Sequence, residues 1–422
     1  MRTNRKHRHM AASSVSATVG LLLTAVTASP AHADESIRGR QWHLDAMHAE
    51  EMWKTSTGKG VTVAVIDSGV SDSITDLQGQ VLDGKDYSAK SGDEHKDHEG
   101  HGTSMAALIA ATGARGELNG SYGLAPGVKI LPIRMRYSTE DGSEVDSKAE
   151  YSRVMTRAIR YAADSQAQII NISMGSSNAP GRKNVSTPAL ASVVKYALGK
   201  GKLIFAAVGN SGDKSNFPEY PAATPGVVGV GAINQNVKYL KSSQWGPQVD
   251  VVAPGKDMIS ACSKGTQICK GDGTSGATAL ASASAALIWS RHPSWTNNQV
   301  LRVLINTMQG NKDSWTRDDS VGYGAVRPRI ALKEPGAPGP ANEYPLPDLA
   351  AAAKTPSSKE PQPSHTRENN SGTEPVNTAS VDKNSHLIPW LSLGLGAAAI
   401  IGGTITVWVV RSRRGAPSPV PD

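Results

Sequence analysis

Short runs of apolar, often β-branched residues alternate along the chain with longer segments of helical character. Each run predicts a buried strand, because strands that are covered on both faces are apolar throughout. The predicted strands occupy residues 61–66, 129–133, 169–172, 203–208, 227–232 and 249–252. Predicted helices occupy residues 103–114, 151–164, 188–198 and 275–290, after a helical or semi-ordered segment at 41–53. This alternation predicts an α/β fold, with a parallel sheet flanked by helices on both faces.

Two further apolar segments, one near each end, predict export and membrane attachment. Residues 1–33 combine a basic start, an apolar run and the small-x-small sequence Ala31-His32-Ala33, which predicts a secretory signal peptide; a retained N-terminal anchor is the alternative. Residues 387–410 are apolar and uncharged, and they are long enough for a transmembrane helix. Arginines follow at once, so the positive-inside tendency predicts a cytoplasmic tail at 411–422 and an extracytoplasmic remainder.

Composition separates a folded domain from a linker. Residues 335–386 are dominated by Pro, Ser, Ala and charged residues, with Tyr344 as the only aromatic, which predicts a flexible Pro-rich linker after a domain at 34–334. The formal net charge is +7, but much of the basic excess lies in the two terminal segments. The part between them is nearly neutral, so we expect no nucleic-acid partner.

The chain has two cysteines, Cys262 and Cys269. In an exported protein such a pair predicts a disulfide, and a metal site built from two thiols alone is the weaker alternative. The bridge would close a hairpin just before residue 275. No calcium-binding loop and no other metal-site residues stand out, so no metal site is assigned and calcium dependence stays open; we expect no cofactor.

Three distant segments carry the residue types of one active site. They are residues 63–69, which contain Asp67, residues 100–103, which contain His101, and residues 273–279, which contain Ser275. Nucleophilic catalysis by a hydroxyl group needs these three types: Ser attacks, His removes its proton, and Asp holds the His tautomer. Asp67 follows a predicted strand, and Ser275 lies at a predicted helix start, where its own N–H can stabilise an oxyanion. The nearby His95 and His98 lack the Gly-His-Gly-Thr setting and are expected to be exposed loop residues.

These segments, together with residues 206–212, resemble the subtilisin-like (S8) serine proteases over about residues 41–333. The whole arrangement is most similar to the mycosins, the membrane-anchored proteases of type VII secretion. The resemblance implies a subtilisin-like sheet and assigns Asn210 as the second oxyanion donor. It also implies two peptide-binding segments, which contain Ser173, Met174 and Gly175 on one side and Gly142 and Ser143 on the other. An ordinary strand end and a surface turn are the alternatives for these two segments.

The chain departs from the family pattern at several positions. Gly276 and Ala279 replace the bulky residue and the proline that usually follow the nucleophile, and Met105 and Ala107 replace the usual Val and Gly after the histidine. These changes indicate repacking, and Gly276 could also loosen the nucleophile turn. The chain before Asp67 is too short for a folded inhibitory propeptide, so the segment that starts at residue 34 belongs to the mature domain.

The sequence therefore predicts a membrane-anchored extracytoplasmic serine endopeptidase that cleaves exported proteins or peptides, linked to a type VII secretion complex. One alternative is a structural subunit that stabilises such a complex and whose proteolysis is dispensable. A nutrient-scavenging protease is a third reading, which the predicted C-terminal anchor opposes.

Overall fold

A seven-stranded parallel sheet lies at the centre of the computed structural model, which describes residues 36–136, 148–178, 185–308 and 316–354. The strand order is β2-β3-β1-β4-β6-β8-β9, and each neighbouring pair is parallel. The bounds are β1 (Thr62–Asp67), β2 (Lys85–Asp86), β3 (Lys129–Arg134), β4 (Ile169–Ile172), β6 (Leu203–Ala207), β8 (Val228–Ile233) and β9 (Val251–Pro254). The predicted α/β fold is confirmed: the six predicted strands are present with ends shifted by at most two residues, and the short edge strand β2 was not predicted.

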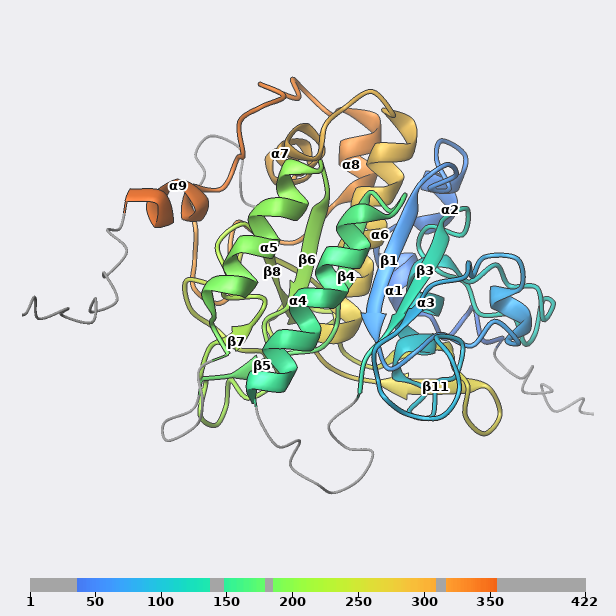
Figure 1. Cartoon of the computed structure of the whole chain (residues 1–422). Helices are drawn as coiled ribbons and strands as arrows, with labels where there is room; N and C mark the ends of the chain where they lie inside the picture. Colours follow the sequence, from blue (N-terminus) through green and yellow to red (C-terminus); the bar gives the residue numbers. More distant parts are fainter. Residues whose placement is uncertain (1–35, 137–147, 179–184, 309–315, 355–422) are drawn as a thin grey trace, which may run out of the picture. The chain divides into compact units, whose positions relative to one another are not determined.

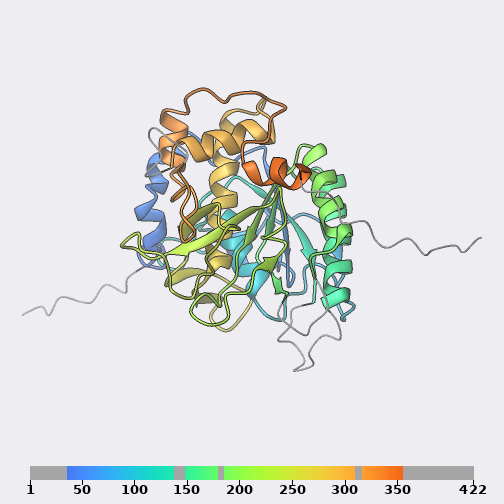
Figure 2. The ribbon, with the colours of Figure 1, turned by 90° about the vertical axis from the view of Figure 1, so that its left-hand side faces the viewer.

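Alternate side chains of the central strands enter two separate cores, as β1 illustrates. Val63 and Val65 of β1 pack on the side of α3 (His101–Ala110) and α6 (Thr274–Arg291). Ala64 and Ile66 pack on the opposite side, against α4 (Lys148–Asp164) and α5 (Pro188–Gly199). The two views show these helix layers on opposite faces of the sheet (Figures 1 and 2). The apolar runs in the sequence thus mark strands that are buried on both faces.

Helix α6 runs through one of the two cores. Every residue from Gly276 to Trp289 is buried, and the helix carries no charged side chain before Arg291. Its many Ala, Ser and Thr residues allow close packing against β4, β6, β8 and β9. Two helices follow: α7 (Asn297–Asn306), which begins with a capping box formed by Thr296 and Gln299, and α8 (Pro328–Lys333).

Two antiparallel ribbons, a 3₁₀ turn and two short helices add to these elements around the sheet. Two antiparallel ribbons pair β10 (Met258–Ala261) with β11 (Ile268–Gly271) and β5 (Ser176–Ser177) with β7 (Glu219–Tyr220). A 3₁₀ turn, η1, covers Thr75–Leu77. Two five-residue helices, α1 (Trp42–Ala46) and α2 (Ala49–Trp53), replace the single predicted segment, because His48 between them has a left-handed backbone (φ 58°).

Helix α3 differs from its predicted range of 103–114. It begins at His101, because Gly100 adopts a left-handed conformation (φ 75°) directly before it. It ends at Ala110, because Thr112 pairs with Tyr122 and Gly113 again has a positive φ of 72°. Tertiary pairing therefore ends a helix whose small residues alone would let it continue.

The described part of the predicted linker packs on the domain, so the predicted boundary at 334 lies about twenty residues too early. Residues 335–354 end in α9 (Pro347–Lys354). Leu346 is only 2% exposed, and the Gly226 N–H donates to Asp348 Oδ2 (2.7 Å). Side chains of α7 bind the backbone of residues 335–354; for example, Arg302 Nη2 donates to Glu343 O (3.0 Å). Composition does not predict this packing, because a few apolar side chains are enough to hold a segment against a surface that the rest of the domain already forms.

The predicted terminal segments are not part of the described structure. The signal peptide (1–33), the remainder of the linker (355–386), the transmembrane helix (387–410) and the tail (411–422) all lie outside it. Within the described residues, no helix combines the length and apolar character needed to cross a bilayer.

Candidate active site

Asp67 and His101 form a hydrogen-bonded pair at the carboxyl end of β1. Asp67 is the last residue of that strand and is fully buried. His101 Nδ1 lies 2.7 Å from Asp67 Oδ1, which also accepts the Ser68 N–H (2.8 Å). The helix that carries His101 approaches the strand closely, because a Cβ atom at Gly102 would lie 2.1 Å from Gly69 O. Glycine at 102 therefore permits the contact between the acid and the imidazole.

A buried acid that the sequence analysis missed, Asp97, fixes the loop before His101. Its carboxylate accepts hydrogen bonds from Gly100 N (2.8 Å), Thr103 N (2.8 Å) and Thr103 Oγ1 (2.6 Å). Ser68 Oγ donates to it as well (2.8 Å), which ties the loop to the end of β1. An Asp that precedes a helix start by a few residues is a signal that could have identified it.

The electrostatics of this pair favour a protonated imidazole. Burial alone would lower the pKa of His101, but the charge and hydrogen bond of Asp67, with smaller effects of Asp97 and Glu99, outweigh it and raise that pKa above 6.5. The ring is therefore a stronger base than a free histidine, and its charged form is stabilised by a buried carboxylate.

Ser275 lies in the first turn of α6, as the sequence predicts. Its Oγ donates to Ser173 O (3.2 Å), and Ser173 Oγ in turn donates to Ser275 O (3.2 Å). These bonds place the nucleophile segment beside the chain that leaves β4. At the N-terminus of an 18-residue helix, the free N–H groups and the helix dipole favour negative charge.

Asn210 follows β6 and lies against the start of α6. Its Oδ1 accepts the Thr274 N–H (2.9 Å) and the Thr274 hydroxyl (3.3 Å). Because Oδ1 is engaged in this way, the Nδ2 group is the end that remains to donate elsewhere. Gly273 (φ 131°) permits the close fit, since a Cβ atom there would lie 2.8 Å from Asn210 Oδ1.

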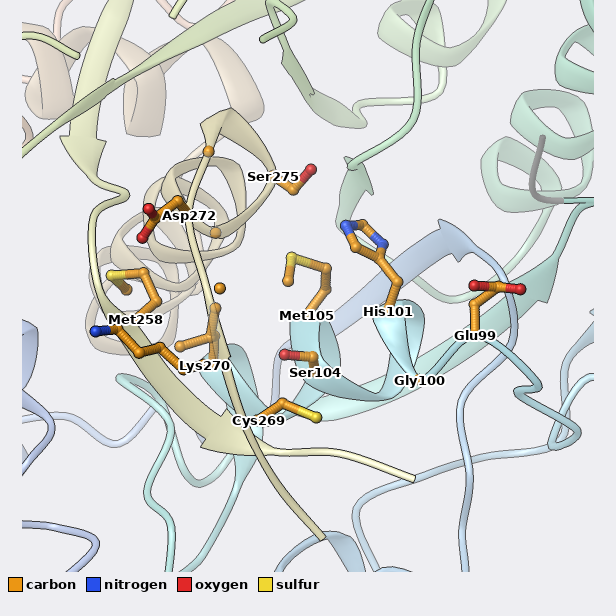
Figure 3. A pocket seen from close by; sticks show the side chains of 14 residues that line it. Glu99, Gly100, His101, Ser104, Met105, Met258, Cys269, Lys270, Asp272 and Ser275 are labelled. Carbon is orange, nitrogen blue, oxygen red and sulfur yellow. The ribbon is translucent and has the colours of Figure 1, made fainter. Parts of the chain in front are cut away.

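A cavity of about 190 Å³ opens between His101 and Ser275 (Figure 3). Met105 and Leu108 of α3, Met258 of β10 and Gly276 of α6 supply its apolar lining. Gly276 is helical, and a Cβ atom there would lie 3.4 Å from Leu108 and 3.5 Å from Met258, so it adds space without breaking the turn. Glu99, Lys270 and Asp272 bring charge to the lining.

The Cys262–Cys269 disulfide is present and links the residue directly after β10 to β11 within the hairpin. Its Cα atoms are 5.8 Å apart, and Cys269 lines the cavity described above. The expectation of a bridged hairpin directly before the nucleophile is therefore confirmed.

The first predicted peptide-binding segment lies beside Ser275. Ser173, Met174 and Gly175 connect β4 to β5, and Ser173 and Met174 are buried. The hydroxyl of Tyr151, which the sequence analysis missed, supports the segment by donating to Met174 O and Tyr220 O, both at 3.2 Å. Gly142 and Ser143 lie outside the described residues.

The loop before His101 carries two further histidines, His95 and His98, and only one of them matches the expected exposure. His98 is exposed, whereas the His95 side chain is only 20% exposed and its Nε2 lies 3.8 Å from both Asp83 and Glu94. In the part of the chain that the structure describes, no group of three or more His, Cys, Asp or Glu side chains is placed to bind a metal ion.

Comparisons with known proteins identify the family of the chain. Residues 58–324 match the family model described as the Subtilase family. The chain belongs to this family. The thermophilic serine proteinase of Bacillus sp. (strain AK1) is 34% identical over 61% of this chain and 59% of its own length, and subtilisin E of Bacillus subtilis is 34% identical over 60% and 61%. The matched region thus spans about six-tenths of these curated relatives.

The chain is also similar to solved structures. MycP1 from Mycobacterium smegmatis superposes with a TM-score of 0.64 at 28% identity and covers 75% of this chain and 89% of its own. A chain of the periplasmic assembly from the ESX-5 inner membrane complex superposes with a TM-score of 0.62 at 28% identity, covering 77% and 89%.

Proposed function

We propose that this chain is a serine endopeptidase that uses Asp67, His101 and Ser275 as its catalytic triad. One observation carries the proposal: the Asp67–His101 hydrogen bond of 2.7 Å ends at a cavity that His101 and Ser275 line together. Three distant segments of the sequence thus meet in one place with the residue types that peptide hydrolysis requires.

The reaction follows from the positions of these groups. Ser275 Oγ leaves the Ser173 carbonyl, attacks the substrate carbonyl and gives its proton to His101. Asp67 accepts from Nδ1 and stabilises the imidazolium. His101 then protonates the leaving amine, and water releases the acyl group by the same steps.

The oxyanion of the tetrahedral intermediate would lie between the Ser275 N–H and Asn210 Nδ2. The Ser275 N–H belongs to the first turn of α6. Asn210 contacts that turn, and its hydrogen bond with Thr274 holds it in the required orientation. Donors fixed before the reaction stabilise developing charge without reorganisation, and loss of one costs roughly 10²–10³ in turnover.

The Ser173–Gly175 segment would pair with the substrate backbone on the acyl side of the scissile bond. Gly142 and Ser143 are proposed for the opposite edge of the substrate. The cavity lies on the side of His101, which delivers the proton to the leaving amine, so it would receive the residue after the scissile bond. The substrate is accordingly an extended protein or peptide segment, and the triad needs no cofactor.

The same similarities support a setting in type VII secretion. Solved relatives include MycP3 from the type VII (ESX-3) secretion system and the ESX-5 assembly named above. Together with the signal and transmembrane segments predicted at 1–33 and 387–410, they favour a protease domain outside the cell membrane, held by one helix and linked to a secretion complex. A structural subunit of such a complex is the second candidate, because one solved relative is itself part of an assembly.

Replacing the nucleophile tests the proposed chemistry. We expect Ser275→Ala in the full chain to lower hydrolysis of a fluorogenic peptide by at least roughly 10³-fold, because no other group can form the acyl-enzyme. Ser290→Ala, at the far end of the same helix, is the matched control and should retain wild-type activity. Equal rates in all three proteins would refute the triad.

The same variant separates the two candidate roles. Exported proteins and their N-termini are compared by mass spectrometry in cells that carry wild type or Ser275→Ala. Loss of cleavage together with loss of secretion, while the complex remains assembled, supports a proteolytic role. Secretion that persists without cleavage supports the structural role instead.

A further inference from the structure

A carboxylate that the mechanism above does not use lies between two backbone segments beside the nucleophile. It belongs to Glu219, the first residue of β7, whose side chain is half-buried. A Cβ atom at Gly175 would lie 2.4 Å from Glu219 Oε2, and a Cβ atom at Gly209 would lie 2.6 Å from Glu219 Oε1. The carboxylate therefore occupies the space that side chains at these two glycines would fill.

Both segments are bonded to the residues around Ser275. The segment of Gly175 begins with Ser173, whose carbonyl accepts from Ser275 Oγ (3.2 Å). On the other side, Gly209 N donates to Thr274 Oγ1 (3.3 Å), directly before Asn210. The carboxylate thus lies between two segments that are each bonded to the nucleophile turn.

The side chain of the acyl residue would point between these two segments, toward the carboxylate. When a carbonyl carbon lies at Ser275 Oγ and its oxygen points to Asn210, the leaving amine is on the side of His101. The side chain of the residue that supplies the carbonyl then falls between the 173–175 and 207–210 segments. Among the described residues that line the cavity beside His101, none belongs to these segments, so the two sides are separate.

The position of the carboxylate is fixed by its surroundings. Gln244, which is fully buried, donates from Nε2 to Glu219 Oε1 (3.0 Å) and to Ser211 Oγ (2.9 Å). β7 pairs with β5 through Ser177 and Glu219, so the backbone of the acid is held by the chain that continues from Gly175. A charge fixed in this way recognises an opposite charge without reorganisation cost.

We infer that Glu219 selects a cationic side chain, Lys or Arg, at the residue whose carbonyl Ser275 attacks. The inference rests on the proposed function and names its substrate class. A Lys ammonium or Arg guanidinium that points between the two segments meets a half-buried carboxylate, whereas an acidic side chain meets a like charge. An uncharged side chain of similar length, such as Met, gains only apolar contact.

Fluorogenic peptides that differ only at the acyl residue test the inference with the full chain. Wild type should cleave Lys and Arg peptides with a kcat/KM roughly 10- to 100-fold above that of the Met peptide, since a hydrogen bond to a charged group has about this worth. The Glu peptide should be the poorest substrate. In Glu219→Gln, which keeps an acceptor for Gln244, the ratio of kcat/KM for the Lys and Arg peptides to that for the Met peptide should fall toward unity.

Asp213→Asn is the matched control, because Asp213 is an exposed acid only six residues before Glu219. It should keep the wild-type preference. Reaction with a fluorophosphonate probe reports the intact nucleophile in every variant. Labelled enzymes that show no preference for Lys and Arg, or a preference that Glu219→Gln leaves unchanged, overturn this inference alone. Wild type that the probe does not label and that cleaves no peptide overturns the proposed function and the inference with it.

Discussion

At the scale of single residues, Ser275 is distinguished by its neighbours. Ser104 lines the same cavity, but its hydroxyl shares a hydrogen bond of 2.6 Å with Ser260 Oγ. Ser275 instead lies at a helix start, across the cavity from a histidine that a buried carboxylate holds. The difference between an ordinary hydroxyl and a nucleophile is therefore the base, the dipole and the donors placed around it.

The raised pKa of His101 predicts a pH profile. The neutral imidazole is the base, so kcat/KM should rise with pH through the pKa of His101, with a midpoint above 6.5. Asp67→Asn removes the strongest influence that raises this pKa, so the midpoint should shift to lower pH while turnover falls by about 10⁴-fold. Asp83→Asn, a change at a fully exposed acid, should leave the profile unaltered. An unchanged midpoint in Asp67→Asn would contradict this account.

How much of the site could be predicted depends on how its residues are encoded. Asp67, His101 and Ser275 stand in short local motifs, so the sequence points to them directly. Asp97 and Glu219 do not, because their roles arise from partners that fold beside them, such as Ser68 for Asp97 and Gln244 for Glu219. A carboxylate among many in a sequence acquires meaning only from such contacts.

At the scale of elements, the β10–β11 hairpin both carries the disulfide and lines the cavity of the active site. β10 and β11 supply Met258, Cys269 and Lys270 to the cavity, and the chain then enters α6 three residues after β11 ends. The disulfide joins Cys262, directly after β10, to Cys269 of β11, near the end of the hairpin away from α6. It therefore fixes the wall that faces His101.

Removing the bridge should lower the stability of the domain. We expect the double variant Cys262→Ser, Cys269→Ser to lose about 2–3 kcal/mol of unfolding free energy, because the unfolded chain is no longer constrained by the closed loop. The value is measured by urea denaturation, with wild type in reducing buffer as a second reference. A variant as stable as the oxidised wild type would show that the bridge contributes nothing to the fold.

At the scale of the whole molecule, residues 335–354 form part of the folded domain. Residues 335–354 follow α8, cross α7 and reach Gly226 before β8. Leu346 and Tyr344 of this segment pack on the main core. The sequence predicted the order of strands and helices but not this addition, because its Pro-rich composition gives no periodic pattern and its binding surface forms only in the folded protein.

Truncating one side chain tests this packing. Leu346→Ala should lower the unfolding free energy by about 2–5 kcal/mol, the usual range for a buried leucine. Leu118→Ala, at a leucine that is 62% exposed, should change it by less than about 0.5 kcal/mol. Equal effects of the two changes, measured by urea denaturation, would show that residues 335–354 do not belong to the stable domain.

The most direct test of the central claim is to identify the residue that a fluorophosphonate modifies. The full chain is treated with the probe, digested and mapped by mass spectrometry, with Ser275→Ala and His101→Ala in parallel. We expect a single adduct on Ser275 in wild type, no adduct in Ser275→Ala, and labelling of His101→Ala that is slower by orders of magnitude. An adduct on another serine, or rapid labelling without His101, would contradict the central claim.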